Sequence, residues 1–123
     1  MKLKFKRIWV EHPIRDHYGH HVFGDESLLI LQHYISGEMG QAGYENHLDA
    51  IRKIRNEEIG GWGDGGNLCS SWIKKDGVLI GHDYIYPPEN NTLSLSLDQF
   101  EKAVIGWKKF IEDESLMEYE IDI

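Results

Sequence analysis

The chain has 123 residues and a formal net charge of −8, and 41% of its residues are hydrophobic. This length suits a single domain over residues 1–123, and the composition is too apolar for a disordered chain. The acidic charge disfavours nucleic acid and anionic membranes as partners, and no apolar run approaches the ~20 residues that span a bilayer. The basic N-terminus lacks the apolar segment of a signal peptide, so we expect a cytoplasmic protein.

The first third of the chain predicts a strand and then a helix. Residues 3–10 favour a strand, because lysines alternate with apolar residues before a continuous apolar run. A histidine-rich connector follows, up to Gly24. Residues 26–36 favour a helix, with Asp25 as the N-cap and Gly37 as the C-terminal stop. The run of four apolar residues within this segment would suit a buried strand equally well.

A second helix and a glycine-rich segment come next. Residues 44–58 predict an amphipathic helix, because apolar residues recur on one helical face. Residues 61–66 formally match G-x-G-x-x-G, but a dinucleotide site needs a strand entering this loop and a helix leaving it. Here the order is reversed, and Asp64 would repel a phosphate. We expect the glycines to cap the helix and turn the chain, with Trp62 packed down or presented to a partner.

A hairpin is predicted after the glycine segment. Two strands, 68–74 and 78–86, are separated by Asp76-Gly77, a sequence typical of a type I′ turn, which needs positive φ at both central residues. The lone Cys69 lies inside the first strand, where a small buried thiol is the usual arrangement.

The C-terminal third predicts a short strand, a helix and a final strand. Residues 92–96 lead into a helix over 97–113, which Ser96 and Gln99 begin with a capping box. The chain ends in a strand over 117–123, in which acidic and apolar residues alternate.

Together these elements predict an α+β fold: an antiparallel sheet of about five strands with two or three helices packed on one face. Three tryptophans are expected in the core: Trp9, Trp72 and Trp107. Three scattered histidines are expected to be half-buried: His33, His47 and His82.

The histidine-rich connector is the main candidate for chemistry. It contains His12, His17, His20 and His21 beside Asp16, and imidazole and carboxylate groups suit zinc or iron. The spacing is irregular, so solvated loop histidines or a pH-sensitive contact explain the segment as well. No nucleophile elbow is present. We therefore expect no catalytic residue, no metal and no cofactor.

Aromatic and acidic residues in the predicted loops and at helix ends are typical of a protein-binding surface. The candidate binding residues are Trp62, Asp64, Asp83, Tyr84, Glu89, Glu112, Asp113 and Glu114. An acidic surface of this kind favours a cationic partner.

Three features follow one another between residues 44 and 111. A helix runs into a glycine/tryptophan turn that ends at Gly66-Asn67, a hairpin follows, and a strand leads through Gln99-Phe100 into a helix containing Trp107-Lys108-Lys109-Phe110. In this order they resemble the small immunity proteins of bacterial polymorphic-toxin and contact-dependent growth inhibition systems.

The resemblance implies that the chain binds and neutralises a cognate toxin domain, such as a cationic nuclease, by occluding its active or substrate-binding surface. An acidic inhibitor would be attracted to such a site and would meet it faster. Two alternatives remain open from the sequence. One is a small metal-dependent enzyme that uses residues 12–21, and the other is a generic protein-binding adaptor.

Overall fold

A computed structural model describes residues 1–66, 68–85 and 90–123. In chain order its elements are β1 (Lys2–Val10), β2 (His17–Gly24), the 3₁₀ turn η1 (Glu26–Leu28), α1 (Leu29–His33), the π-helical segment η2 (Tyr34–Met39), α2 (Tyr44–Arg55), β3 (Trp62–Gly65), β4 (Cys69–Lys74), β5 (Gly77–His82), β6 (Thr92–Leu95), α3 (Leu97–Glu112) and β7 (Glu118–Asp122). The described part of the chain includes no helix long and apolar enough to cross a membrane.

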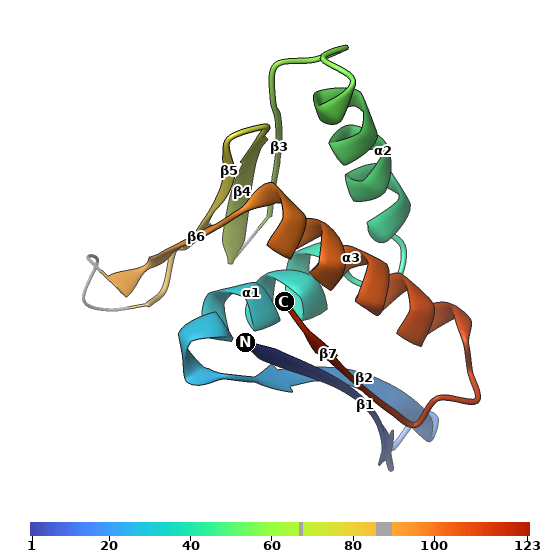
Figure 1. Ribbon diagram of the computed structural model, residues 1–123. Helices are drawn as coiled ribbons and strands as arrows, with labels where there is room; N and C mark the ends of the chain where they lie inside the picture. The colour runs from blue at the N-terminus through green and yellow to red at the C-terminus, as the bar shows by residue number, and fades with distance from the viewer. Residues whose placement is uncertain (67, 86–89) are drawn as a thin grey trace.

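The fold is α+β with antiparallel strands, as predicted, but the strands form two sheets and not one (Figure 1). The first sheet has the order β2-β1-β7 and the second the order β3-β4-β5-β6. Two strands that the sequence did not predict, β2 and β3, account for the difference. β1 pairs with β2 on one side and β7 on the other, and β4 pairs with β3 and β5, so neither β1 nor β4 has a free edge at which the two sheets could join.

The helices also do not share one face of a sheet, as the sequence had predicted. The segment from η1 through η2 lies between the two sheets, where it packs against both β2 and β5. α3 covers the inner face of the first sheet, and α2 packs along α3. One cluster of buried apolar side chains draws on both sheets and on all of these helices.

The segment after Asp25 is helical and continues further than predicted. Helical structure extends through Met39, so the alternative of a buried strand is wrong. Gly40, with a φ of 57°, ends it, whereas Gly37 lies inside it. A left-handed φ is accessible to glycine at little cost, so Gly40 is the C-terminal stop.

α3 follows the sequence prediction closely. The Ser96 hydroxyl accepts a hydrogen bond from the backbone N–H of Gln99, and the Gln99 side chain accepts one from the backbone N–H of Ser96, so the capping box is confirmed. Trp107 is buried, and its Nε1–H donates to the carbonyl of Gly40 at 2.7 Å. Gly106 lets the helix approach β7, since a Cβ there would lie 2.5 Å from Cδ1 of Ile121.

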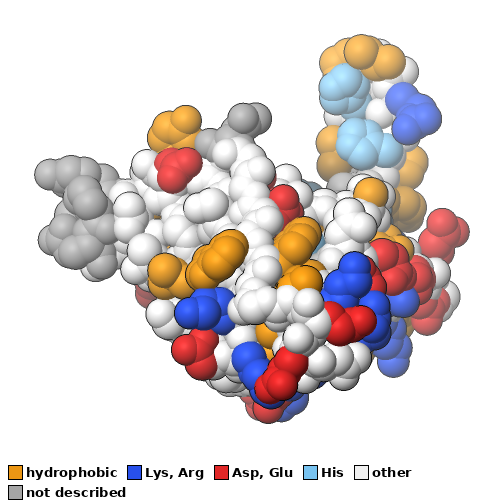
Figure 2. Space-filling model, turned by 90° about the horizontal axis from the view of Figure 1, so that it is seen from above, with side chains coloured by type: hydrophobic (Ala, Val, Ile, Leu, Met, Phe, Trp, Pro, Cys, Tyr) orange, Lys and Arg blue, Asp and Glu red, His pale blue; other side chains and the backbone are white. Residues whose placement is uncertain are grey.

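The β1–β2 hairpin extends beyond the rest of the first sheet. β7 pairs with β1 only from Lys2 to Lys6, whereas β2 pairs with β1 up to Val10. Figure 2 shows the hairpin standing clear of the body at the upper right, with pale blue histidines among orange side chains. Trp9, predicted to be a core residue, lies on this extension and is exposed, because it lies beyond Lys6, the last residue of β1 that pairs with β7.

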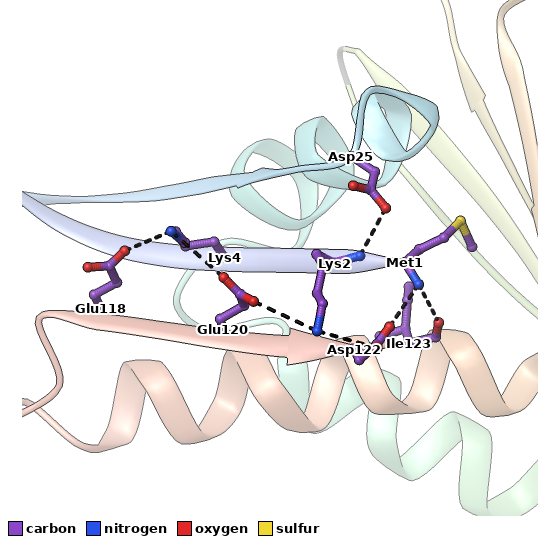
Figure 3. A network of polar contacts seen from close by, with 8 residues as sticks. All are labelled: Met1, Lys2, Lys4, Asp25, Glu118, Glu120, Asp122 and Ile123. Atoms are coloured by element: carbon purple, nitrogen blue, oxygen red, sulfur yellow. Dashed lines mark hydrogen bonds and ion pairs between the residues drawn. The ribbon is translucent and has the colours of Figure 1, made fainter.

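The outer face of the first sheet is charged (Figure 3). The ammonium of Lys4 lies 3.0 Å from Glu118, and that of Lys2 lies 3.4 Å from Asp122. The N-terminal ammonium donates to Asp122 at 2.8 Å, which joins the two ends of the chain. Lysines of β1 therefore neutralise the acids that alternate along β7.

Candidate protein-binding surface

No described helix covers the outer face of the second sheet, and this face is almost uncharged. Alternation along β4 buries Cys69, Ser71 and Ile73 and turns the residues between them to solvent. Trp72 stands directly opposite Leu79 of β5, and their side chains are 52% and 47% exposed. The rest of this face comes from small or polar residues: Gly63, Gly65, Ser70, Lys74, Gly77, Gly81, Thr92 and Ser94. We call these residues, with Trp72 and Leu79, the outer β-face.

The indole of Trp72 lies on the backbone of the neighbouring strand. A Cβ built on Gly63 would lie 2.9 Å from Cε3 of Trp72, and one on Gly61 would lie 3.1 Å from its Cζ2. Glycine at both positions leaves room for the ring to lie over β3. The glycine-rich segment thus forms part of a strand and a seat for Trp72. It does not cap α2, because that helix already ends at Arg55 with Asn56 as its C-cap.

A shallow hollow adjoins the Trp72–Leu79 pair. It has a volume of about 340 Å³, and its lining runs from Trp72 and Leu79 across to Ser94 of β6. Lys74 and Asp76 are the charged residues that line it. An exposed aromatic with a small apolar hollow beside it, ringed by polar residues, is the common arrangement of a protein-binding hot spot.

The turn beside the hollow differs from the predicted type I′ turn. Lys74 pairs with Gly77, so the loop residues are Lys75 and Asp76. Among the described non-glycine residues only Glu57 has a positive φ, which excludes a type I′ turn through Asp76. The hairpin itself is confirmed, although β5 ends at His82 and not at Tyr86, which lies outside the described residues.

A buried polar chain holds β4 in place beneath the outer β-face. Nδ1–H of His47 donates to the carbonyl of Gly43 at 2.7 Å, so its Nε2 accepts a hydrogen bond from the Tyr34 hydroxyl at 2.6 Å. The Tyr34 oxygen in turn accepts from the Ser71 hydroxyl at 2.7 Å. Burial raises the pKa of Tyr34 and lowers the pKa of His47, so these hydrogen-bonded side chains are uncharged at neutral pH.

These residues link the helices to the second sheet and do not face solvent. Tyr34, His47 and Ser71 are all buried, and each of their side-chain hydrogen-bonding atoms has a partner. We infer that this hydrogen-bonded network positions β4, because a substrate would have no access to its hydroxyl groups. The sequence had suggested that His47 and His82 are half-buried, but both are buried.

The histidine-rich segment is not the irregular connector that the sequence predicted. His17, His20 and His21 belong to β2, and His20 and His21 point to opposite faces of the sheet because they are adjacent in a strand. His12 lies in the turn of the hairpin. Across the residues that the structure describes, no three His, Cys, Asp or Glu side chains are arranged to hold a metal ion.

The candidate binding residues fall into three separate places. Trp62 and Asp64 lie on the inner side of β3, where the Trp62 ring stands edge-on to His47 at 4.9 Å. Asp83 and Tyr84 follow β5, and the Tyr84 side chain is 72% exposed. Glu89 lies outside the described residues.

The third place is at the end of α3, far from the other two in Figure 1. Glu112 is the last residue of the helix and Asp113 its C-cap, and Glu114 follows. The Asp113 carboxylate accepts hydrogen bonds from the hydroxyl and backbone N–H of Ser115, which hold its pKa below the ordinary value. These three acids therefore do not form one surface with the residues near β3 and β5.

Trp72 is the residue that sequence reasoning missed. It was expected in the core, yet its neighbours on the same strand face, Ser70 and Lys74, are polar, whereas the opposite face carries Cys69 and Ile73. That alternation was the signal available in the sequence. No protein-family model matches the chain, and no curated protein or solved structure with which it was compared is significantly similar to it.

Proposed function

We propose that this chain is a protein-binding domain whose binding surface is the outer β-face. The observation that carries the proposal is the exposed Trp72–Leu79 pair on a sheet face that no helix of the described residues covers. The exposed Trp72 ring does not stabilise the free domain, whereas a partner that covers the ring would remove it from water.

A cationic partner fits the charges around this surface. About half of the described acids are paired with bases, as on the first sheet. Asp76 and Asp83, beside the second sheet, are among the described acids that have no Lys or Arg within 4.0 Å. Asp76 borders the outer β-face and Asp83 follows β5. Unneutralised acids at the rim would speed the approach of a basic protein, and the apolar centre would slow its release.

The resemblance to immunity proteins gives this partner an identity. We propose that the chain neutralises a cognate bacterial toxin domain, a cationic nuclease, in the cytoplasm of the cell that makes both. The inhibitor would occlude the active or substrate-binding surface of the toxin without catalysis or a cofactor. An adaptor that binds another basic protein could use the same surface. The binding test therefore uses the toxin itself as the partner.

The test is a titration of the purified chain against the product of the gene immediately upstream, where a toxin gene would lie. Trp72→Ser should raise Kd by about 30-fold or more, the effect of losing a hot-spot residue. Ile105→Ser is the matched control, because Ile105 on α3 is also 52% exposed but lies outside the outer β-face. It should leave Kd unchanged.

Two results would overturn the proposal. If the upstream product binds the two variants and the parent equally well, the outer β-face is not the binding surface. If the upstream product shows no affinity for the parent chain, the assignment to a toxin–immunity pair is wrong.

A further inference from the structure

The hairpin of β1 and β2 has a two-stranded outer portion that the body of the molecule does not support. The last backbone hydrogen bond from β1 towards β7 runs from the N–H of Arg7 to the carbonyl of Met117. Beyond Arg7 the two strands have only each other (Figures 1 and 2). A two-stranded ribbon alone is marginally stable in water, so an ordered one benefits from a further contact.

This outer portion exposes apolar side chains on both of its faces. Trp9 stands opposite Tyr18 with ring centroids 5.0 Å apart, on the sheet face that carries Phe5 and the core further down the strand. Ile8 is exposed on the other face, as is Phe23 nearer the body. Exposed apolar residues grouped in this way mark a surface that another molecule covers.

β2 is also a free sheet edge without the usual protection. It is eight residues long and carries no Lys, Arg, Asp, Glu or Pro. Natural edge strands are normally blunted by such residues or kept short. The other three sheet edges are of that kind, since β7 carries three acids and β3 and β6 have four residues each.

The hydrogen bonding of β1 and β2 fixes which groups face outward. The backbone N–H of Asp25 donates to the carbonyl of Lys2, and pairing alternates from there. The N–H and C=O groups of Tyr18, His20 and Val22 therefore point away from β1. In the described part of the chain, no backbone hydrogen bond outside the sheet reaches these three residues.

We infer that two copies of this chain pair through β2, antiparallel and about a two-fold axis, to form one continuous six-stranded sheet. Only residues whose backbone groups point outward can form the hydrogen-bonded pairs. Two such registers overlap seven residues each, one centred on His20 and one on His21. The second would pair Gly24, whose φ of 152° departs from regular strand backbone, so the first is favoured. It sets His20 opposite the partner's His20 and Tyr18 opposite the partner's Val22. The apolar face of one sheet then continues into the other.

A second copy fits this edge better than a charged partner does. β2 has no fixed charge to select a basic or acidic strand, and its antiparallel pairing with itself opposes no like charges while its histidines are neutral. The pairing also leaves the outer β-face free, because that face belongs to the other sheet. The dimer therefore does not depend on the proposed function.

The two-fold axis makes the contact sensitive to acid. The Gln41 side-chain amide donates to Nδ1 of His20 at 3.0 Å, which favours the neutral ring. Burial and the nearby Arg7 lower the pKa of His20. Tyr18, His21 and Glu114 are the other titratable groups that face it or lie beside it. Protonation would set two imidazolium ions opposite each other across the axis.

Sedimentation equilibrium of the purified chain tests the inference. At about pH 7.5 the parent should have twice the chain mass of 14.3 kDa, and it should dissociate as the pH falls towards about 5, where histidine becomes charged. His20→Lys should weaken the dimer by about tenfold or more at pH 7.5, because it places like charges in contact. His12→Lys adds the same charge in the turn, outside β2, and should leave the mass unchanged.

Two further variants keep the result decisive. His20→Gln should remain dimeric near pH 5, even if His20→Lys disturbs the packing of His20 on Phe110. Trp72→Ser should be as dimeric as the parent. A parent that is monomeric at concentrations of about 100 μM, well above a typical micromolar Kd, would overturn the inference. So would a dimer that His20→Lys leaves intact, or one that Trp72→Ser breaks.

Discussion

The outer faces of the two sheets differ in their charge. On the first sheet, lysines of β1 lie within 4.0 Å of acids of β7, so the part of the face that these two strands form is charged but neutralises itself. On the second sheet the face is nearly free of charge, and an aromatic–aliphatic pair occupies its centre. The first is the pattern of a solvated surface, and the second is the pattern of a surface that a partner covers.

This difference changes how the net charge of −8 is interpreted. Many of the acids are engaged in ion pairs within the chain, so the total says little about any one surface. Under the proposed function, recognition would depend on the acids beside the second sheet that have no basic partner, and on the apolar pair that they border. The location of charge therefore matters more for function than its sum.

The largest effect should come from comparing the same residue type on the two sides of the molecule. Trp107→Ala should lower the free energy of unfolding by about 3–5 kcal/mol, because it deletes a buried ring against Phe5 and leaves the Gly40 carbonyl without its donor. Trp72→Ala, on the outer β-face, should cost about 1 kcal/mol or less. Urea unfolding measures both. Equal costs would contradict the assignment of Trp72 to binding.

A smaller effect is expected from the polar chain beneath the second sheet. Tyr34→Phe should cost about 1–3 kcal/mol, because Nε2 of His47 and the Ser71 hydroxyl would both lose their buried partner. Tyr84→Phe is the matched control, since that side chain is exposed and should tolerate the change. Thermal unfolding of the two variants checks this, and a Tyr34→Phe protein as stable as the parent would show that β4 does not depend on the chain.

The helix that covers the first sheet provides the next test. Ser96→Ala should cost about 1 kcal/mol, because the N–H of Gln99 would lose its acceptor at the N-terminus of α3. Ser94→Ala, two residues earlier and exposed on β6, should have little effect. The two urea transitions can be compared directly, and coincident midpoints would mean that the cap contributes nothing.

The smallest effect should appear on the charged face, as a stability difference that is present at neutral pH and disappears as the pH falls. Lys4 lowers the pKa of Glu118, and the N-terminal ammonium and Lys2 lower the pKa of Asp122. Carboxyls with lowered folded-state pKa values stabilise the fold above their ordinary pKa, and this contribution is lost as pH falls through the lowered value. Lys4→Gln should therefore reduce the loss of Tm on acidification, most clearly at low salt. Identical curves of Tm against pH for the parent and Lys4→Gln would show that the ion pairs contribute nothing to stability.

The sequence predicted the elements whose signals are local. The capping box of α3, the periodicity of α2 and the hairpin of β4 and β5 all depend on residues close together in the chain, and all are confirmed. The alternation in β7 is also confirmed, because it reflects a strand with one face on the core.

The missed features depend on contacts between distant residues. β2 has histidine and glycine where strands usually have β-branched residues, and it is a strand because it pairs with β1 over its whole length. β3 has two glycines beside its tryptophan and aspartate, and its backbone accommodates the indole of Trp72. The division into two sheets follows from these pairings, and the candidate binding residues were scattered because loop position alone says nothing about which sheet face is uncovered.

The most direct test of the central claim is hydroxyl-radical footprinting of the complex with the upstream gene product. Side-chain oxidation reports which residues lose contact with water, and it needs no substitution. Trp72 and Leu79 should lose most of their oxidation in the complex, whereas Ile105, which is equally exposed in the free protein, should be oxidised at the same rate as before. Unchanged oxidation of Trp72 and Leu79 in a saturated complex would contradict the outer β-face as the binding surface.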